Sequence, residues 1–373
     1  MSDFDALDHA FMGRALALAA QGLATAHPNP RVGCVLVRSG QVLAEGWHER
    51  AGGPHAEAAA LANLLGSAAG ATAYVTLEPC NHHGRTPPCS EALIKAGVAR
   101  VVYAIGDPNP LVKGGGAQRL REAGVQVQSG LLAAEATELN AGFIKRMRTG
   151  VPLVRLKLAM SLDGRTALSD GRSQWITGEA ARLDVQHWRA RSAAILTGIG
   201  TVLADDPRLS VRPAGAAVRQ PLRVILDSGL KTPPQARVFE GIDPQGVWIF
   251  TACTDPQRLT ALSARGARVE QAASGSQVDL AQVLTMLGRS GINEVLVEAG
   301  ATLAGALIEQ QCVDELLLYM APVVLGDRAR GLLRLPEPAT LEQARRFEVF
   351  ESVAVGTDQR IRMRVGQTAC SPG

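Results

Sequence analysis

Residues 55–89 read HAEAAALANLLGSAAGATAYVTLEPCNHHGRTPPC, and the N-terminal part of the chain is organised around them. The stretch contains three potential metal ligands, His55, Cys80 and Cys89. One histidine and two cysteines can supply three zinc ligands and leave a fourth position open, which is what distinguishes a catalytic zinc from a structural one. Glu57 is not needed as a ligand, so its carboxylate is available to move protons.

The neighbouring residues place these ligands at the ends of secondary structure elements. A proline at position 54 favours a helix over about 55–65. Residues two apart in a helix point roughly 200° away from each other, so His55 and Glu57 share a site only if it lies off the helix N-terminus. Cys80 follows a strand expected at 74–77, and Cys89 opens another helix, whose N-terminus lowers the pKa of a thiol.

The order of His55, Glu57 and the two cysteines is the signature of zinc deaminases. The spacing departs from nucleobase deaminases, which have two residues between the cysteines, whereas this chain has eight. A non-catalytic zinc clip stays open as an alternative, with His82 or His83 as its fourth ligand.

Length and composition narrow the class of protein. At 373 residues, the chain is long enough for roughly two domains. The net charge of +3 is too small to indicate nucleic-acid binding. The N-terminus lacks the pattern of a signal peptide, no apolar run reaches about 18 residues, and six cysteines in so long a chain are not a disulfide framework. We therefore expect a cytoplasmic protein with no membrane partner.

The N-terminal part alternates helical and strand patterns up to a boundary near residue 148. Helices are expected at 5–22, 117–123 and 133–148. Strands are expected at 32–37, 41–44 and 125–127.

The C-terminal part also alternates strand and helix patterns. Strands are expected at 153–160, 193–197, 222–227, 247–251, 294–298 and 315–319, and helices at 179–191, 279–289 and 302–310. This alternation predicts an α/β domain around a largely parallel sheet. The usual dinucleotide-binding fingerprint fails, because the glycine pattern that begins at Gly198 lacks its third glycine. Small residues after the strand at 294–298 could form a phosphate cradle at a helix N-terminus, or serve only tight strand–helix packing.

The motifs of the first part resemble those of the bacterial riboflavin-biosynthesis deaminase/reductases. The motifs are Asn29-Pro30, His48, His55-Ala56-Glu57, Glu78-Pro79-Cys80, Gly84-Arg85-Thr86-Pro87-Pro88-Cys89 and Asp107-Pro108-Asn109-Pro110. The long loop between the cysteines is normal in that family. The resemblance implies a cytidine-deaminase-like α/β/α sandwich with one zinc ion held by His55, Cys80 and Cys89. It also implies that Glu57 is the proton carrier and that Asn29, His48, Asp107 and Asn109 lie near the substrate.

The motifs of the second part resemble the reductase half of the same enzymes, which is similar to dihydrofolate reductase in fold and uses NADPH. The motifs include Lys157-x-Ala159-x-Ser161-Leu162-Asp163-Gly164, Ser173-Gln174-Trp175-Ile176-Thr177, Thr201-Val202-Leu203-Ala204-Asp205-Asp206-Pro207 and Glu298-Ala299-Gly300. By this resemblance, the NADPH contacts are Ala159, Trp175, Thr201, Asp205, Ser228, Gly300, Ala301, Thr302 and Leu303. The residues on the substrate side are Lys157, Ser173, Arg189, Leu209, Arg212 and Glu298.

The sequence thus predicts two active sites for consecutive steps on one chain. Residues 1–148 form a zinc-dependent deaminase domain, 149–366 an NADPH-dependent reductase domain, and 367–373 a flexible tail. The substrates implied are small phosphorylated pyrimidines, with a homo-oligomeric enzyme and no nucleic acid as partner. The main alternative is a nucleic-acid base deaminase with an appended binding domain, which would need stacking aromatics; aromatic residues are only 4% of this chain.

Overall fold

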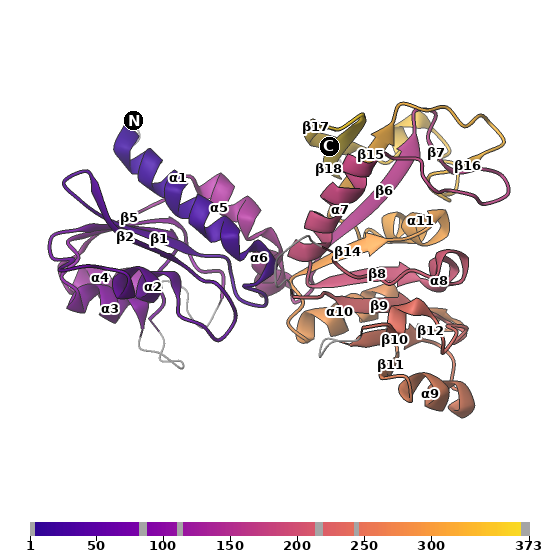
Figure 1. Cartoon of the computed structure of the whole chain (residues 1–373), viewed down its shortest axis with the longest axis horizontal. Helices are drawn as coiled ribbons and strands as arrows, with labels where there is room; N and C mark the ends of the chain where they lie inside the picture. Colours follow the sequence, from indigo (N-terminus) through magenta and orange to yellow (C-terminus); the bar gives the residue numbers. More distant parts are fainter. Residues whose placement is uncertain (1–3, 82–87, 110–114, 213–218, 242–245, 367–373) are drawn as a thin grey trace, which may run out of the picture. The chain divides into compact units, whose positions relative to one another are not determined.

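The computed structural model describes residues 4–81, 88–109, 115–212, 219–241 and 246–366 (Figure 1). The chain forms two compact units, Met1–Gly150 and Val151–Gly373. The domain boundary expected after residue 148 lies two residues before this division, and the expected tail at 367–373 lies outside the described residues.

The first unit is a five-stranded sheet between two layers of helices (Figure 1). Its strands lie in the order β2-β1-β3-β4-β5, with β2, β1 and β3 antiparallel and β3, β4 and β5 parallel. The strands are β1 (Gly33–Arg38), β2 (Gln41–Trp47), β3 (Thr72–Leu77), β4 (Arg100–Ile105) and β5 (Gln126–Ser129). The helices are α1 (Ala6–Gln21), α2 (Ala56–Ala62), α3 (Cys89–Lys95), α4 (Gly115–Glu122), α5 (Ala133–Leu139) and α6 (Ala141–Thr149), with a short 3₁₀ turn η1 (Gly22–Ala24).

Both faces of this sheet are buried, because alternate residues of one strand point to opposite sides. In β1, Cys34 and Leu36 pack in the core that contains α2, α3 and α4, whereas Val35 and Val37 pack in the core that contains α1 and α5. Gly33 allows α1 to cross the strand closely, since a Cβ there would lie 2.0 Å from the carbonyl oxygen of Ala15. This arrangement confirms the predicted deaminase-like sandwich.

One predicted helix of this unit is wrong in its extent. The pattern at 133–148 is two helices, α5 and α6, with a break at Asn140. The buried Asn140 side chain is held by the backbone of Arg31, which donates to Oδ1 (2.8 Å) and accepts from Nδ2 (2.9 Å). A long-range contact therefore ends the first helix, and no local pattern shows it.

The second unit is built on a nine-stranded sheet in the order β11-β10-β9-β8-β14-β6-β15-β18-β17. The first seven strands run parallel, and the last two add antiparallel. The strands of this sheet are β6 (Leu153–Ser161), β8 (Ala194–Gly198), β9 (Leu222–Leu226), β10 (Val247–Thr251), β11 (Ala267–Gln271), β14 (Glu294–Glu298), β15 (Glu315–Ala321), β17 (Phe347–Val355) and β18 (Asp358–Val365). Two small ribbons pair β7 (Arg165–Ala167) with β16 (Arg330–Gly331) and β12 (Ala273–Ser274) with β13 (Gln277–Val278).

Helices cover both faces of the large sheet. They are α7 (Glu179–Arg191), α8 (Ile199–Asp205), α9 (Pro256–Ser263), α10 (Leu280–Arg289) and α11 (Ala301–Glu309), with 3₁₀ turns η2 (Arg237–Phe239) and η3 (Leu341–Gln343). In β14, Val295 and Val297 pack in the core that holds α10 and α11, while Leu296 faces α7. The carboxyl ends of the parallel strands meet at one edge, where open α/β sheets bind their ligands. Within the described residues, no helix combines the length and the apolar character needed to cross a membrane.

Candidate active sites

The first unit brings its three candidate zinc ligands together. His55 is the N-cap residue of α2, Cys80 lies three residues after β3, and Cys89 is the first residue of α3. Their donor atoms all lie within 4.8 Å of one another. The Nδ1 atom of His55 is 3.5 Å from the Sγ atom of Cys80 and 3.3 Å from that of Cys89. One nitrogen and two sulfur donors at these separations suit a zinc ion.

The electrostatics of the two thiols also suit a metal. A hydrogen bond from Cys89 lowers the pKa of Cys80 to about 4, against the effect of burial and with help from His55. The same contact raises the pKa of Cys89, because two neighbouring thiols do not both ionise readily without a cation. The backbone N–H of Cys89 also donates to the Cys80 sulfur at 3.5 Å. A bound cation would relieve this repulsion, so the site fits zinc.

Glu57 lies beside this cluster on the first turn of α2 and is only 3% exposed. Burial raises the pKa of its carboxyl group. His55 adopts extended backbone angles ahead of the helix, which lets its side chain share a site with Glu57 off the helix N-terminus, as the sequence predicts. A carboxyl group with a raised pKa can both accept and return a proton near neutral pH.

The four candidate substrate residues of this unit form two pairs. The Nε2 atom of His48 lies 3.0 Å from the Nδ2 atom of Asn29, and its ring meets the ring of His55 edge-on with centroids 5.8 Å apart. Asp107 accepts a hydrogen bond from the backbone N–H of Asn109 at 2.8 Å. The charge of Asp107 also contributes to the raised pKa of His55, which the hydrogen bond to Cys80 mainly causes. Both pairs thus belong to the surroundings of His55.

Glu78 is a residue of this site to which the sequence assigned no role. It is 5% exposed, and its carboxylate accepts hydrogen bonds from the backbone N–H groups of Ala117 (3.1 Å) and Asp107 (3.4 Å). Glu78 therefore ties the segment of Cys80 to the segment of Asp107 and to the first turn of α4. Its place in Glu78-Pro79-Cys80 was visible in the sequence, but its partners were not.

The second unit has a cavity of about 1650 Å³ at the carboxyl edge of its sheet. Every residue predicted to contact NADPH or the reductase substrate lines it: Lys157, Ala159, Ser173, Trp175, Arg189, Thr201, Asp205, Leu209, Arg212, Ser228, Glu298, Gly300, Ala301, Thr302 and Leu303. These residues come from β6, β14 and α7, from the connection between β7 and α7, and from the segments that follow β8, β9 and β14. The volume exceeds that of a typical drug-sized pocket, so it suits a dinucleotide together with a second molecule.

An ion pair and a buried lysine occupy one side of this cavity. Arg189 binds Glu298 through two hydrogen bonds of 2.6 and 2.8 Å. Burial acts to raise the pKa of Glu298, but the charge of Arg189 outweighs it and keeps that pKa below its usual value. Burial, opposed by Glu298, lowers the pKa of Lys157. The Lys157 ammonium also lies 5.9 Å from the ring centroid of Tyr319.

Tyr319 and Lys231 line the cavity as well, and the sequence did not single them out. Tyr319 is 1% exposed on β15 and donates a hydrogen bond to Asp184 at 2.5 Å. Lys231 follows the carboxyl end of β9, a position where residues of a parallel sheet meet ligands. Once a strand is expected at 222–227, that position is the signal that could have found Lys231.

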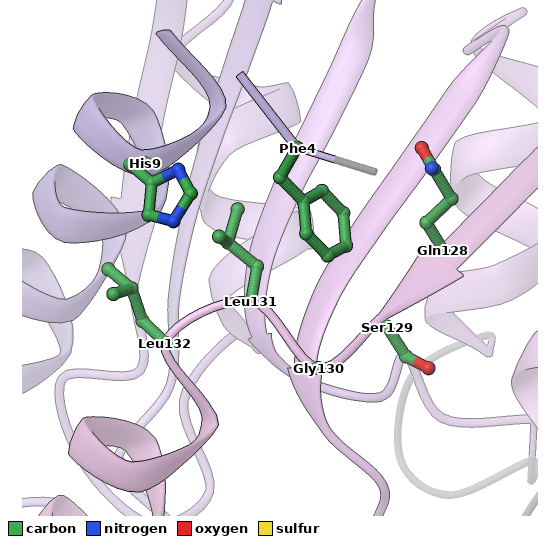
Figure 2. Close-up of a pocket in the computed structure, with 7 residues that line it drawn as sticks. All are labelled: Phe4, His9, Gln128, Ser129, Gly130, Leu131 and Leu132. Carbon is green, nitrogen blue, oxygen red and sulfur yellow. The ribbon is translucent and has the colours of Figure 1, made fainter. Parts of the chain in front are cut away.

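Figure 2 shows a smaller pocket of about 410 Å³ in the first unit, beside the start of α1 and the connection from β5 to α5. It contains none of the candidate site residues. Its lining is Phe4, His9, Gln128, Ser129, Gly130, Leu131 and Leu132. The Nδ1 atom of His9 lies 2.8 Å from the carbonyl oxygen of Asp5, and we assign this pocket no chemistry.

Comparisons with known proteins agree with this division. A family model described as the cytidine and deoxycytidylate deaminase zinc-binding region matches residues 5–105, and one described as the RibD C-terminal domain matches residues 152–359. The chain is 49% identical over 362 residues to the riboflavin biosynthesis protein RibD of Escherichia coli (strain K12), covering 94% of this chain and 97% of that protein. It is 47% identical over 372 residues to RibD of Haemophilus influenzae, covering 97% and 98% of the two chains.

Solved structures give the same result. Acinetobacter baumannii RibD, form 1, has a TM-score of 0.89 at 45% identity, over 97% of this chain and 99% of that one. A diaminohydroxyphosphoribosylaminopyrimidine deaminase/5-amino-6-(5-phosphoribosylamino)uracil reductase from Thermotoga maritima has a TM-score of 0.85 at 34% identity, over 96% and 99% of the two chains.

Proposed function

The chain belongs to the RibD family of bifunctional riboflavin-biosynthesis enzymes, and we propose that each of its units carries one of the two activities. The first unit removes an amine from 2,5-diamino-6-(5-phosphoribosylamino)pyrimidin-4-one by hydrolysis. The second uses NADPH to reduce the ribosyl group of 5-amino-6-(5-phosphoribosylamino)uracil to ribityl. The observation that most supports the proposal is that the predicted residues of each activity gather at one place within one unit.

In the deaminase unit, His55, Cys80 and Cys89 would hold one zinc ion. Zinc supplies a Lewis acid that makes water a nucleophile at neutral pH. Glu57 would accept the two protons of that water one after the other, passing the first to the ring nitrogen and the second to the amine that leaves as ammonia, a task that its raised pKa suits. Asn29, His48, Asp107 and Asn109 would orient the pyrimidine.

In the reductase unit, the cavity would hold NADPH and the phosphorylated substrate side by side. NADPH supplies the hydride. Ala159, Trp175, Thr201, Asp205, Ser228 and the segment 300–303 would bind it. The remaining residues, Lys157, Ser173, Arg189, Leu209, Arg212 and Glu298, would bind the substrate. Arginine suits a sugar phosphate because its guanidinium can donate two hydrogen bonds to one phosphate.

Two alternatives fit the chain less well. A nucleic-acid base deaminase would need an appended binding domain, whereas the second unit matches the RibD C-terminal domain. A zinc clip without chemistry would need a fourth protein ligand. The candidate metal cluster within the described part of the chain has three members, and the fourth ligands expected for a clip, His82 and His83, do not belong to the described residues. The match to the deaminase zinc-binding region is therefore what favours the catalytic site. The absence of nucleic acid and membrane as partners, a homo-oligomeric state and a cytoplasmic location remain predictions.

Glu57→Ala tests the division of labour. We expect ammonia release to fall by roughly 100- to 10,000-fold, because the proton carrier is lost. Zinc content should stay at one ion per chain, and NADPH-dependent reduction of the deaminated substrate should be unchanged. Glu135→Ala, which removes an exposed acid from the first turn of another helix of the same unit, is the control. Loss of both activities in a folded Glu57→Ala protein would contradict two separate sites.

A further inference from the structure

The reductase cavity has a rigid turn where the chain leaves β9. Asp227, which is fully buried, accepts hydrogen bonds from both the backbone N–H and the hydroxyl of Thr232, each 2.7 Å long. Between them, Leu230 adopts the left-handed conformation (φ 49°) and is only 4% exposed in the hydrophobic core. The turn that carries Ser228, Gly229 and Lys231 is therefore closed by the hydrogen bonds between Asp227 and Thr232 and anchored in the hydrophobic core by Leu230.

The Lys231 side chain folds back over this turn. A Cβ added to Gly229 would lie 3.4 Å from Cε of Lys231 and 3.6 Å from its Cγ, so the aliphatic stem covers the glycine. Both Lys231 and Ser228 line the cavity. Lys231 therefore shares the cavity lining with Ser228, one of the residues expected to contact NADPH.

Lys231 also differs from two arginines that line the cavity, Arg208 and Arg237. Arg208 and Arg237 both form ion pairs with Glu240. Across the described residues, by contrast, no carboxylate pairs with the Lys231 ammonium, and no hydrogen bond holds it. A cation without a carboxylate partner is suited to binding an anion that enters the cavity.

The order of the strands indicates which anion that is. Along the carboxyl edge, β6, β14, β8 and β9 are neighbours, so three strand spacings of about 4.8 Å, or roughly 14 Å, separate Lys157 on β6 from the turn after β9. The segment 300–303 at the start of α11 lies between, after β14. A dinucleotide bound with its reactive ring near Ala159 and its pyrophosphate at the start of α11 would extend its adenosine half toward β9. The adenosine ribose of NADPH carries a 2′-phosphate, whereas that of NADH carries a hydroxyl.

We propose that Lys231 binds the 2′-phosphate of NADPH and so gives the reductase its preference for NADPH over NADH. The inference rests on the proposed reductase function and adds to it the residue that selects the cofactor. A dianionic phosphate gives the ammonium its missing partner, while a hydroxyl leaves it without one. The turn fixed by Asp227 holds the lysine in place before the cofactor arrives, which limits the entropy lost on binding.

Binding measurements on the full chain test this without relying on turnover. The dissociation constants of NADP⁺ and NAD⁺ are measured by titration calorimetry for the wild type and for Lys231→Met, which keeps the stem over Gly229 and removes only the charge. We expect NADP⁺ to bind about 10- to 100-fold more weakly to Lys231→Met, as follows from losing one charged hydrogen bond. NAD⁺ binding should change by less than about twofold, and Lys231→Arg should restore most of the preference.

Arg208→Met is the matched control, because it removes a cation that also lines the cavity but already has a carboxylate partner, Glu240. It should leave the ratio of the two dissociation constants within about twofold of the wild type. Equal weakening of NADP⁺ and NAD⁺ by Lys231→Met, an unchanged ratio, or an equal loss in Arg208→Met would overturn the assignment. A wild-type chain that binds NAD⁺ as tightly as NADP⁺ would instead contradict the proposed NADPH-dependent function itself.

Discussion

The two candidate sites are encoded in the chain in different ways. The metal cluster comes from one stretch, residues 55–89, and its three donors lie at the ends of elements that pack on the same sheet. The reductase cavity draws its lining from residues that extend from Lys157 to Arg334, brought together by the parallel order of the strands. A metal site needs a few donors of defined type, so a short pattern can reveal it. A cofactor cavity needs a surface, and that surface exists only once the strands are placed.

This contrast predicts that deamination in the first unit needs the metal and that reduction in the second unit does not. Cys89→Ser should lose zinc and reduce deamination by roughly 1,000-fold or more, because a serine hydroxyl does not replace a thiolate ligand and water is no longer activated. NADPH-dependent reduction should remain within about twofold of the wild type. Metal analysis of the purified chain and separate assays of the two steps provide the measurement.

Cys312→Ser is a useful control for this change, since Cys312 is a half-buried cysteine of the second unit. Removal of zinc from the wild type with a chelator should reproduce the loss of deamination and leave reduction intact. If reduction fell in parallel with deamination, the two sites would not be independent and the contrast between them would fail.

The sequence predicted most of the first site because its chemistry lies next to its motif. The ligands, Glu57 and the helix ends that carry them follow from residue type and spacing. The connection between Glu78 and the segments at Asp107 and Ala117 did not follow, because it joins residues that are 29 and 39 positions apart. The break between α5 and α6 at Asn140 was not predicted for the same reason, since the hydrogen-bond partner of Asn140, Arg31, is 109 positions away.

Glu78 therefore offers a smaller and more specific test. In Glu78→Gln, an NH₂ group replaces one of the two carboxylate oxygens. It then faces a backbone N–H, so two donors meet and that N–H loses its acceptor. A buried N–H left without its acceptor costs about 1–3 kcal/mol. Because the affected N–H groups belong to Asp107 and Ala117, we expect the KM of deamination to rise about tenfold, with zinc content unchanged and a smaller change in kcat.

Glu122→Gln removes an exposed carboxylate from α4 and serves as the control, because it should change none of these quantities. Loss of zinc in Glu78→Gln, or a fall in kcat at constant KM, would show that Glu78 supports the metal centre and not the substrate segment.

In the second unit, the sequence predicted the central strands better than the edges. The strands at 153–160 and 294–298 are mostly apolar and mostly buried, and the structure confirms them as β6 and β14. The terminal strands β17 and β18 were not predicted; β17 is exposed along most of its length, and in β18 the apolar residues Ile361, Met363 and Val365 alternate with arginines. Tyr319 lies on a strand that was predicted, but its contacts with Lys157 and Asp184 depend on neighbouring elements.

Tyr319 gives the smallest expected effect and the sharpest test of how the cavity works. Lys157 is surrounded by Glu298, Arg189 and the ring of Tyr319, and burial holds its pKa below the usual lysine value. An aromatic face stabilises an ammonium by about 0.5–1 kcal/mol at such a distance. Tyr319→Leu removes that face and should lower the pKa of Lys157 further, by less than about one unit.

The direction of the change in pH dependence follows from which form of Lys157 is stabilised. The ammonium exists below the pKa, so a lower pKa means that substrate binding by the charged lysine is lost at a lower pH. The alkaline limb of the reductase pH profile should therefore move toward acid in Tyr319→Leu. Tyr319→Phe keeps the ring and loses only the hydrogen bond to Asp184, so its alkaline limb should stay in place. Equal shifts in both variants would assign the effect to the hydrogen bond between Tyr319 and Asp184. The Lys157 ammonium would then be stabilised through that hydrogen bond and not by the aromatic ring of Tyr319.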